Sequence, residues 1–579
     1  MPLKRYRDLL LTYLKPQWRQ GLLLSILLCG GLALSLINPQ LMRWFIDSAS
    51  TGQQLQALLG VALLYLGVAF LSQFVSVVET YVAENMALIA TNRLRTDLML
   101  HVLQLDSAFH TAHTPGELIE RVDGDVGKLS NFFSRFILSL LGNVLLLSGV
   151  LFMLFRVDWR VGLVMSCFVL FALLVMNRVR NLASPYWEAE RQASAELFGF
   201  LEERLSGTED IRASGANAFM LRGLHERSRT VLRTLVRAVQ INSASWVSMS
   251  IIFVIGTAAA LALGALLFQA GQISIGTVYL IFAYTNLLNN PIEQIVQQVR
   301  DMQQASGSIK RILDLLVIQG TIEDGRGEAL PPGPLAVSFD DVTFCYHPEL
   351  PVLKHISLTL EPGTVLGLLG RTGSGKTTMT RLLARLYDPT QGALRLGDID
   401  LRELSLDDLR SRLGMVTQDV HVLHTTVRHN LTFFDGSISD ERIIEVLEEL
   451  GLGPWFHALP EGLSTKLAPG GTGLSAGEAQ LFAFARIFLK NPGLVILDEA
   501  SSRLDPATER RLEQAIQRLM KDRTGIIIAH RLATVLRADM IMILEDGQTV
   551  EYGPREQLAA DPHSRFSELL RTGLEEALI

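Results

Sequence analysis

Cysteine and charge are both scarce in this sequence of 579 residues. Its three cysteines, Cys29, Cys167 and Cys345, lie far apart, without the close pairing of a disulfide framework or a zinc site. Charged residues make up 19% of the chain, and the formal net charge of −7 is small for this length. This balance gives no reason to expect nucleic acid as a partner. We interpret the cysteines as packing residues.

The N-terminus lacks the pattern of a secretory signal peptide. It reads MPLKRYRDLLLTYLKPQWRQ, a basic, amphipathic stretch without a short apolar core that ends in a small-residue cleavage site. Basic amphipathic helices bind at membrane surfaces. We therefore expect this segment to lie along the cytoplasmic face of a membrane.

Long uncharged apolar runs are abundant in the first half of the chain. Each has about the length that crosses a hydrocarbon core as a helix. The runs are 21–42, 57–78, 136–155, 161–177, 245–270 and 273–292. Buried helices of a large soluble protein are the alternative, but six such runs in half a chain would need an improbably large core. The sequence therefore predicts six transmembrane helices.

The spacing of these runs indicates a topology. The gaps after the first, third and fifth runs are short, whereas those after the second and fourth are long, polar and helical in pattern. With a cytoplasmic N-terminus, both long gaps are cytoplasmic, and their basic residues, such as Arg93, Lys128 and Arg204, agree with the positive-inside rule. Arg156 and Arg160, in a short outer loop, do not agree with it. We expect the membrane helices to continue well into the cytoplasm.

The composition changes near residue 325, where RGEALPPGP forms a linker rich in Gly and Pro. After it, strand and helix patterns alternate as in a soluble α/β domain. We predict a transmembrane domain at 1–310, a linker at 311–334 and a nucleotide-binding domain at 335–579. The fold class is thus an α-helical membrane domain fused to an α/β domain.

A phosphate-binding loop lies inside VLGLLGRTGSGKTTMTRLLARL, between an apolar strand and a helical pattern. Its glycines let backbone N–H groups converge on phosphate oxygens at a helix N-terminus. We expect Lys376 to reach the β and γ phosphates of ATP and the Thr377 hydroxyl to bind Mg²⁺. The residues expected to bind ATP here are Gly370, Arg371, Thr372, Gly373, Ser374, Gly375, Lys376, Thr377 and Thr378.

Two further apolar strands end in polar residues. GLVILDEA ends in Asp498 and Glu499, and GIIIAH ends in His530. Beside a phosphate loop, we expect Asp498 to hold Mg²⁺ through water and Glu499 to act as the base for the attacking water. The alternative for the acidic pair is a helix cap. We interpret His530 as a γ-phosphate sensor, with a structural histidine as the alternative.

From about residue 335 to its end, the chain resembles the nucleotide-binding domain of the ATP-binding cassette family. Tyr346 matches the aromatic residue that stacks on adenine, although a buried core tyrosine remains an alternative. Gln418 matches the glutamine that contacts Mg²⁺ and the attacking water. LSAGE, with Ser475 and Gly477, stands in the place of the signature LSGGQ, and Asp505 matches the loop that crosses to a partner domain.

The N-terminal half is similar to the exporter class with long intracellular helices, of the type IV multidrug and lipid exporters. The resemblance rests on topology and on HTPGELIERVDGDVGKLSNF and EERLSGTEDIRASGANAF. It implies coupling helices near 108–116 and near 213–220, the second centred on 214–219. It also implies location in a bacterial inner membrane, with the cassette in the cytoplasm.

In this family two cassettes pair head to tail, each ATP lying between one phosphate loop and the opposite signature. The resemblance therefore implies ATP-driven export by alternating access. The absence of charge from the membrane runs suits a small amphipathic or hydrophobic substrate, such as a drug, lipid or peptide. A soluble cassette ATPase of repair or translation disagrees with the membrane runs. An ATP-gated regulator or channel with little turnover is the remaining alternative.

The sequence favours a heterodimer of two different half-transporters. The residues that match the catalytic pattern are Tyr346, Lys376, Gln418, Asp498, Glu499 and His530. The signature that this chain offers to a partner is altered, because Ala476 adds a Cβ and Glu478 a negative charge. A homodimer that tolerates LSAGE is the alternative, since oligomers of identical chains are commoner.

Overall fold

The computed structural model divides the chain into two units. It describes residues 11–135, 140–325, 327, 329–417, 420–468, 474–498, 506–528 and 535–572. The helical unit comprises Met1–Gln104 and His113–Ile318, and the cassette unit comprises Leu105–Ala112 and Gln319–Ile579. The second unit thus contains a short segment that lies between two parts of the first in the sequence.

The helical unit is built from long helices. In chain order its elements are η1 (Lys15–Gln17), α2 (Trp18–Ser50), α3 (Leu55–Gln104), α5 (Pro115–Ile119), the π-helix η2 (Glu120–Asp125), α6 (Val126–Arg135), α7 (Gly142–Val157), α8 (Trp159–Ser206), α9 (Thr208–Ala213), α10 (Asn217–Gln269), α11 (Ile275–Leu287) and α12 (Asn289–Val317). The short helix α4 (Ser107–Ala112) belongs to the cassette unit.

Each of the six predicted apolar runs lies mainly on helices in the part of the chain that the structure describes. Four helical spans are long and apolar enough to cross a membrane: Leu11–Ser50, Leu55–Gln104, Trp159–Ser206 and Asn217–Gln269. The third run lies on α7, an apolar helix of 16 residues, and the sixth lies mainly on α11, of 13 residues. Helix α11 is short because it ends at Leu287, and after Leu288 the chain continues as α12 from Asn289.

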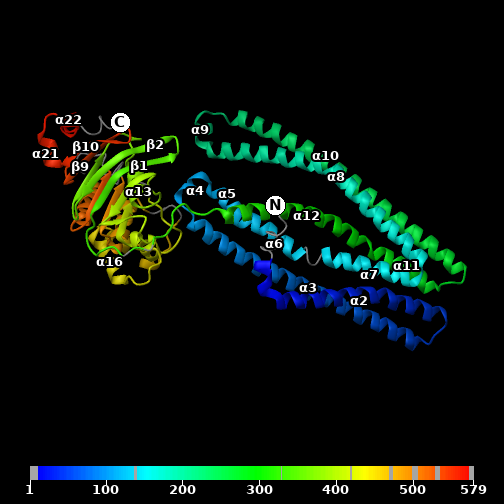
Figure 1. Cartoon of the computed structure of the whole chain (residues 1–579). Coiled ribbons are helices and arrows are strands. Elements are labelled where there is room, and N and C mark those ends of the chain that lie inside the picture. The colour runs from blue at the N-terminus through cyan, green and yellow to red at the C-terminus, as the bar shows by residue number, and fades with distance from the viewer. Residues whose placement is uncertain are drawn as a thin grey trace. The chain divides into compact units, whose positions relative to one another are not determined.

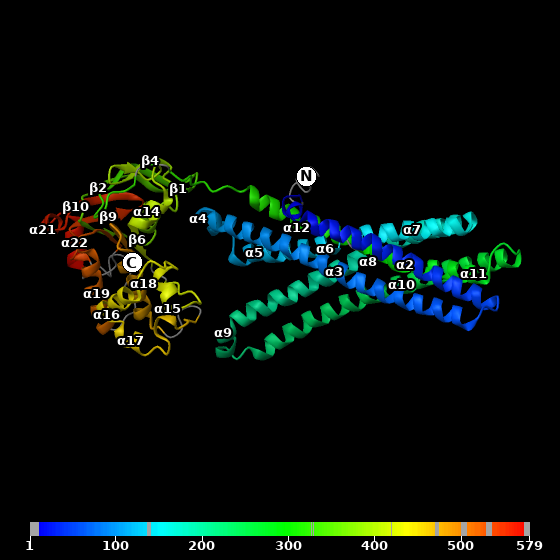
Figure 2. The same ribbon diagram turned by 90° about the horizontal axis from the view of Figure 1, so that it is seen from below.

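The long cytoplasmic gaps are helical, as predicted. Helix α8 continues from its apolar run to Ser206, and α10 begins at Asn217, well before the fifth run. Figures 1 and 2 show α8 and α10 side by side, joined at one end by α9. The segment predicted as the second coupling helix covers the end of α9, a turn with Gly215 at φ +64°, and the start of α10.

A buried carboxylate joins η2 to α12. The side chain of Asp125 is fully buried, and Arg311 donates hydrogen bonds to both of its oxygens, with Nε to Oδ2 at 2.7 Å. Ser308 Oγ donates a further bond to Asp125 at 2.9 Å. Burial alone would raise the pKa of Asp125, but these hydrogen bonds and the Arg311 charge hold it below its usual value. Asp125 is therefore charged at neutral pH and fixes α12 against the segment around η2.

The cassette unit contains two sheets. Its strands are β1 (Val337–His347), β2 (Leu350–Leu360), β3 (Val365–Leu369), β4 (Gln391–Leu396), β5 (Ile399–Asp400), β6 (Leu413–Val416), β7 (Leu494–Asp498), β8 (Thr524–Ile528), β9 (Met540–Glu545) and β10 (Gln548–Pro554). One sheet is antiparallel, in the order β2-β1-β4-β5. The other has the order β10-β9-β3-β8-β7-β6, parallel except for β10.

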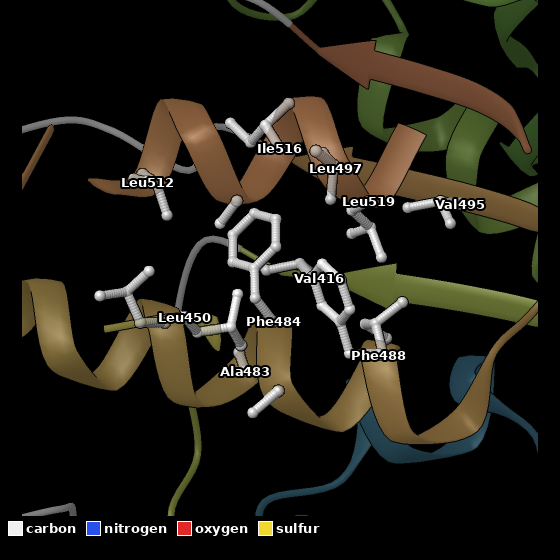
Figure 3. Close-up of a cluster of buried hydrophobic side chains, with 14 of the residues drawn as sticks. Val416, Leu450, Ala483, Phe484, Phe488, Val495, Leu497, Leu512, Ile516 and Leu519 are labelled. Carbon is white, nitrogen blue, oxygen red and sulfur yellow. The ribbon is translucent and has the colours of Figure 1, made fainter. Parts of the chain in front are cut away.

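Helices cover the parallel sheet. They are α13 (Lys376–Leu383), α14 (Leu406–Arg412), α15 (Val427–Thr432), α16 (Asp440–Glu449), α17 (Gly453–His457), α18 (Ala476–Lys490), α19 (Pro506–Met520), α21 (Arg555–Ala560) and α22 (Arg565–Thr572). Figure 3 shows Phe484 and Phe488 of α18 directed toward Leu497 and toward Ile516 and Leu519 of α19. This apolar core joins α18 to β7, so the signature helix rests on the strand that ends in Asp498.

Candidate nucleotide site

The parallel sheet brings the predicted ATP residues to one edge. Its register aligns Val416 of β6 with Leu497 of β7, Leu497 with Ile527 of β8, and Ile527 with Gly367 of β3. The four strands are parallel and end within two residues of this line, so their carboxyl ends form a single edge. Ligands of open α/β sheets bind at that edge.

The phosphate loop follows β3 at this edge and ends at α13. Three of its glycines, Gly370, Gly373 and Gly375, have φ of +146°, +86° and +104°. Side chains make this backbone unfavourable, and a Cβ on Gly375 would lie 2.6 Å from Leu353 Cδ2. A Cβ on Gly370 would overlap the carbonyl oxygen of Leu544. The loop therefore needs glycine at both of these positions for conformation and for space.

The polar side chains of the loop suit a phosphate ligand. The Ser374 hydroxyl is buried, 4% of the residue being exposed, and finds no hydrogen-bond partner in the part of the chain that the structure describes. Lys376 is 6% exposed, and its ammonium group folds back to donate to the carbonyl oxygens of Gly370 and Arg371. An orphaned hydroxyl and a cation inside a cradle of backbone N–H groups fit the oxygens of a polyphosphate. Thr377, which follows Lys376 in the first turn of α13, is exposed.

Tyr346 is held next to the phosphate-loop helix. Its hydroxyl lies 3.2 Å from Thr378 Oγ1 and accepts a hydrogen bond from Arg381 at 3.3 Å. Its ring packs edge-on against Phe344 and Tyr387, with centroids 4.8 and 5.2 Å away. The residue is nonetheless 37% exposed, which argues against a buried core tyrosine. One part of the ring is thus available to a base.

Sequence reasoning did not find the two residues that hold this tyrosine, Arg381 and Tyr387. Nothing in their local sequence signals the contact, because it depends on how β1 and α13 are brought together by the fold. Asp498, by contrast, lies where the strand pattern predicts it, as the last residue of β7. Gln418, Glu499, Asp505 and His530 lie outside the described residues, so their roles stay predictions.

The signature serine forms a capping box. Ser475 is the N-cap of α18, and its Oγ accepts from the backbone N–H of Glu478 at 3.3 Å. In return, both the backbone N–H and the hydroxyl of Ser475 donate to Glu478 Oε2, each at 2.8 Å. Gly477 is buried beside them in the first turn. The Ser-x-x-Glu spacing was visible in the sequence and is the usual signal for this motif.

Comparison with known proteins agrees with both units. A family model described as "ABC transporter transmembrane region" matches residues 21–292, and one described as "ABC transporter" matches residues 353–502. The "Fatty acid ABC transporter ATP-binding/permease protein" of Mycobacterium bovis is 32% identical over 468 residues, which cover 81% of this chain and 74% of that protein. The "ATP-dependent lipid A-core flippase" of Syntrophus aciditrophicus is 30% identical over 550 residues, covering 93% and 89%.

The fold has a close structural counterpart. The structure of a bacterial Atm1-family ABC exporter with ATP bound matches with a TM-score of 0.80 over 96% of this chain and 98% of that one, at 23% sequence identity. This likeness extends through both the helical and the cassette regions. Together with the family models and the curated relatives, it shows that the chain belongs to the ABC transporter family, as a membrane-spanning, ATP-driven transporter with the fold of an exporter.

Proposed function

We propose that the chain is one half of a dimeric exporter that moves an amphipathic or hydrophobic molecule across the bacterial inner membrane by alternating access. The observation that carries the ATPase part is the phosphate loop, whose left-handed glycines and orphaned Ser374 hydroxyl suit a polyphosphate. Relatives named for fatty acid and for lipid A support an amphipathic substrate. The apolar helices of the membrane unit support it too.

Within the nucleotide site, we propose that Tyr346 stacks on adenine while the loop 370–378 holds the phosphates. Lys376 places positive charge beside the transferred phosphoryl group, the main means of stabilisation in this reaction. Glu499 accepts a proton from the attacking water, and Gln418 and His530 orient that water and the γ-phosphate. Thr377, Asp498 and Gln418 would hold Mg²⁺, which neutralises phosphate charge when bound.

Reconstitution tests this function directly. The purified full-length transporter, placed in lipid vesicles, should hydrolyse ATP, and an amphipathic substrate should raise the rate. The same vesicles should accumulate that substrate only when ATP is supplied on the cassette side. Hydrolysis without transport of any amphipathic molecule would contradict export and favour an ATP-gated regulator.

We further propose that segments 113–117 and 214–219 transmit cassette closure to the membrane helices. The second segment contains the turn between α9 and α10 and the start of α10, and it includes none of the predicted ATP-binding residues. Phe219 in this segment is 68% exposed. Substitutions there should reduce transport and substrate-stimulated hydrolysis while ATP binding stays normal. Unchanged transport after disruptive changes in both segments would show that coupling occurs elsewhere.

The dimer is proposed to contain a second, related chain. The support is the pair of differences in this chain's signature, Ala476 and Glu478, together with a phosphate loop that matches its motif in full. In asymmetric members of the family, a chain with intact catalytic residues and an altered signature pairs with a chain of the reverse kind. Expression of this chain alone decides the point, because a stable homodimer with full ATPase and transport activity would exclude the requirement for a different partner.

A further inference from the structure

Helix α3 carries a carboxylate inside the packing between two apolar helices. Glu79 lies on the face of α3 that meets α2, partly buried, with Val75 one turn before it. A Cβ built on Gly31 of α2 would lie 3.5 Å from Glu79 Oε2 and 3.6 Å from Val75 Cγ1. Because Gly31 has no side chain, the Glu79 carboxylate can lie close against the backbone of α2. Figure 1 shows α2 and α3 lying side by side, as their contacts require.

This position is deep within the apolar part of α2. Gly31 lies ten residues from Gly21 and eleven from Met42, the ends of the first apolar run, or about 15 Å from each end along the helix. The packing fixes the alignment independently, because Leu24, nearer the cytoplasmic end of the run, clusters with Ala83 and Met86 of α3. Glu79 directly follows the second apolar run on α3, which ends at Val78, and it packs level with the middle of the first apolar run on α2.

Glu79 has no compensating partner in the part of the chain that the structure describes. Among the residues that the structure describes, it forms neither an ion pair nor a hydrogen bond. Two polar side chains of α2 are paired with distant residues, Gln40 with Tyr284 and Asp47 with Ser274. An ionisable side chain at membrane depth is costly unless something pairs with it, so such a residue marks a functional site.

We propose that Glu79 binds the positively charged group of a cationic amphipathic substrate at the α2–α3 interface. This inference rests on the proposed export function and narrows its substrate class. A carboxylate in an apolar surrounding attracts a cation strongly, because water does not screen the charge. By the same argument it repels an anion of equal shape. The apolar side chains around it suit the hydrophobic part of such a molecule.

Two hydrophobic ions of nearly equal size and opposite charge test this directly. Tetraphenylphosphonium should stimulate ATP hydrolysis by the reconstituted transporter and be taken up in an ATP-dependent way, whereas tetraphenylborate should do neither. Glu79→Gln should raise the half-maximal concentration of tetraphenylphosphonium at least about tenfold, since it removes one charge from a poorly screened site. Glu79→Asp, which keeps the charge, should restore part of the response.

Glu84→Gln is the matched control. Glu84 lies five residues further along α3, carries the same charge and is exposed, and it also forms no ion pair among the described residues. This variant should respond to tetraphenylphosphonium within about twofold of the wild type, because its charge is outside the interface. Unstimulated hydrolysis by Glu84→Gln should equal that of the wild type, which shows that this variant is folded and hydrolyses ATP.

The failure of this inference differs from the failure of the proposed function. If the wild type and Glu79→Gln respond equally to the cation, or if tetraphenylborate stimulates as well as tetraphenylphosphonium, Glu79 is not a cation site. In that case a neutral amphipathic substrate is still exported. If no amphipathic molecule of any charge is transported by the wild type, the export function itself is wrong, and the cation site is overturned with it.

Discussion

The phosphate loop and the signature loop of the same cassette differ in how their polar groups are satisfied. In the phosphate loop, Ser374 has a buried hydroxyl without a partner among the described residues, and the backbone is held in conformations that need glycine. In the signature, the Ser475 hydroxyl and backbone N–H are already bonded to Glu478. The phosphate loop therefore keeps a hydroxyl that a ligand can bond, whereas the hydroxyl and N–H of the signature serine are bonded to Glu478.

This difference affects how strongly each loop can bind ATP. A buried polar group without a hydrogen-bond partner raises the free energy of the protein, and a ligand that bonds to it removes that penalty. A serine whose hydrogen already points to a carboxylate has less to offer to a phosphate, and the carboxylate charge opposes the same ligand. This contrast supports the proposed asymmetric dimer, in which this chain would supply the phosphate loop of the stronger ATP site and the signature of the weaker one.

The largest expected effect is that of Glu499→Gln. An amide cannot accept the proton of the attacking water, so hydrolysis should slow by about 10²–10⁴-fold. ATP binding should persist, because the phosphate loop and the Mg²⁺ ligands are unchanged. Single-turnover hydrolysis and binding of a fluorescent ATP analogue measure the two effects separately. Turnover near the wild-type rate would show that Glu499 is not the base.

Two opposite substitutions, one in each loop, compare how strongly the phosphate loop and the signature depend on glycine. Gly375→Ala should lower ATP affinity at least about tenfold, since alanine in a left-handed conformation costs roughly 1–2 kcal/mol and its Cβ would also contact Leu353. Ala476→Gly, at the exposed first position of α18, should change affinity much less. Equilibrium ATP binding to both variants provides the measurement. Equal effects of the two changes would mean that the loops do not differ in this respect.

Substitution of Tyr346 should have an intermediate effect on ATP binding, and this effect should depend on the adenine base. Tyr346→Leu removes the ring and should raise the KM for ATP about tenfold, because base stacking contributes about 1–3 kcal/mol. Binding of tripolyphosphate, which has no base, should not change. Tyr346→Phe keeps the ring but loses the contacts to Thr378 and Arg381, so its effect should be smaller. A loss of tripolyphosphate binding in Tyr346→Leu would instead indicate a purely structural role.

Much of this architecture was predictable from local sequence patterns. The apolar runs, the short connections after α2, α7 and α10, and the loop between β3 and α13 all follow from periodicity, length and glycine placement. These features depend on neighbours in the sequence. The end of α11 at Leu287 was not predicted, because hydropathy alone does not show where a helix ends.

Contacts between segments that are distant in the chain could not be predicted from the sequence. The buried pair of Asp125 and Arg311 joins residues 186 positions apart, and neither residue stands in a motif that signals the other. Tyr387 packs on Tyr346 for the same reason, through the arrangement of the sheets. The alignment of Glu79 with the middle of α2 likewise required the packing of Leu24 on Ala83 and Met86. Sequence patterns located the chemistry, and the fold showed which groups are satisfied and which are not.

The smallest expected effect is that of Glu478→Gln, which makes the same carboxylate-to-amide change as Glu499→Gln but on the signature side. Glutamine also completes a capping box, so α18 should keep its N-cap. The change removes a like charge facing the partner's ATP, worth about 1 kcal/mol at 4 Å in water, and should therefore lower the KM for ATP by up to about fivefold. Higher salt should reduce the difference in KM between the wild type and Glu478→Gln, because it screens exposed charges.

Glu478→Ala is the control, since it removes the charge and the cap together and should destabilise the start of α18. If Glu478→Gln raised the KM at low salt, the carboxylate would be assisting ATP binding, and the signature of this chain would not be its weaker side.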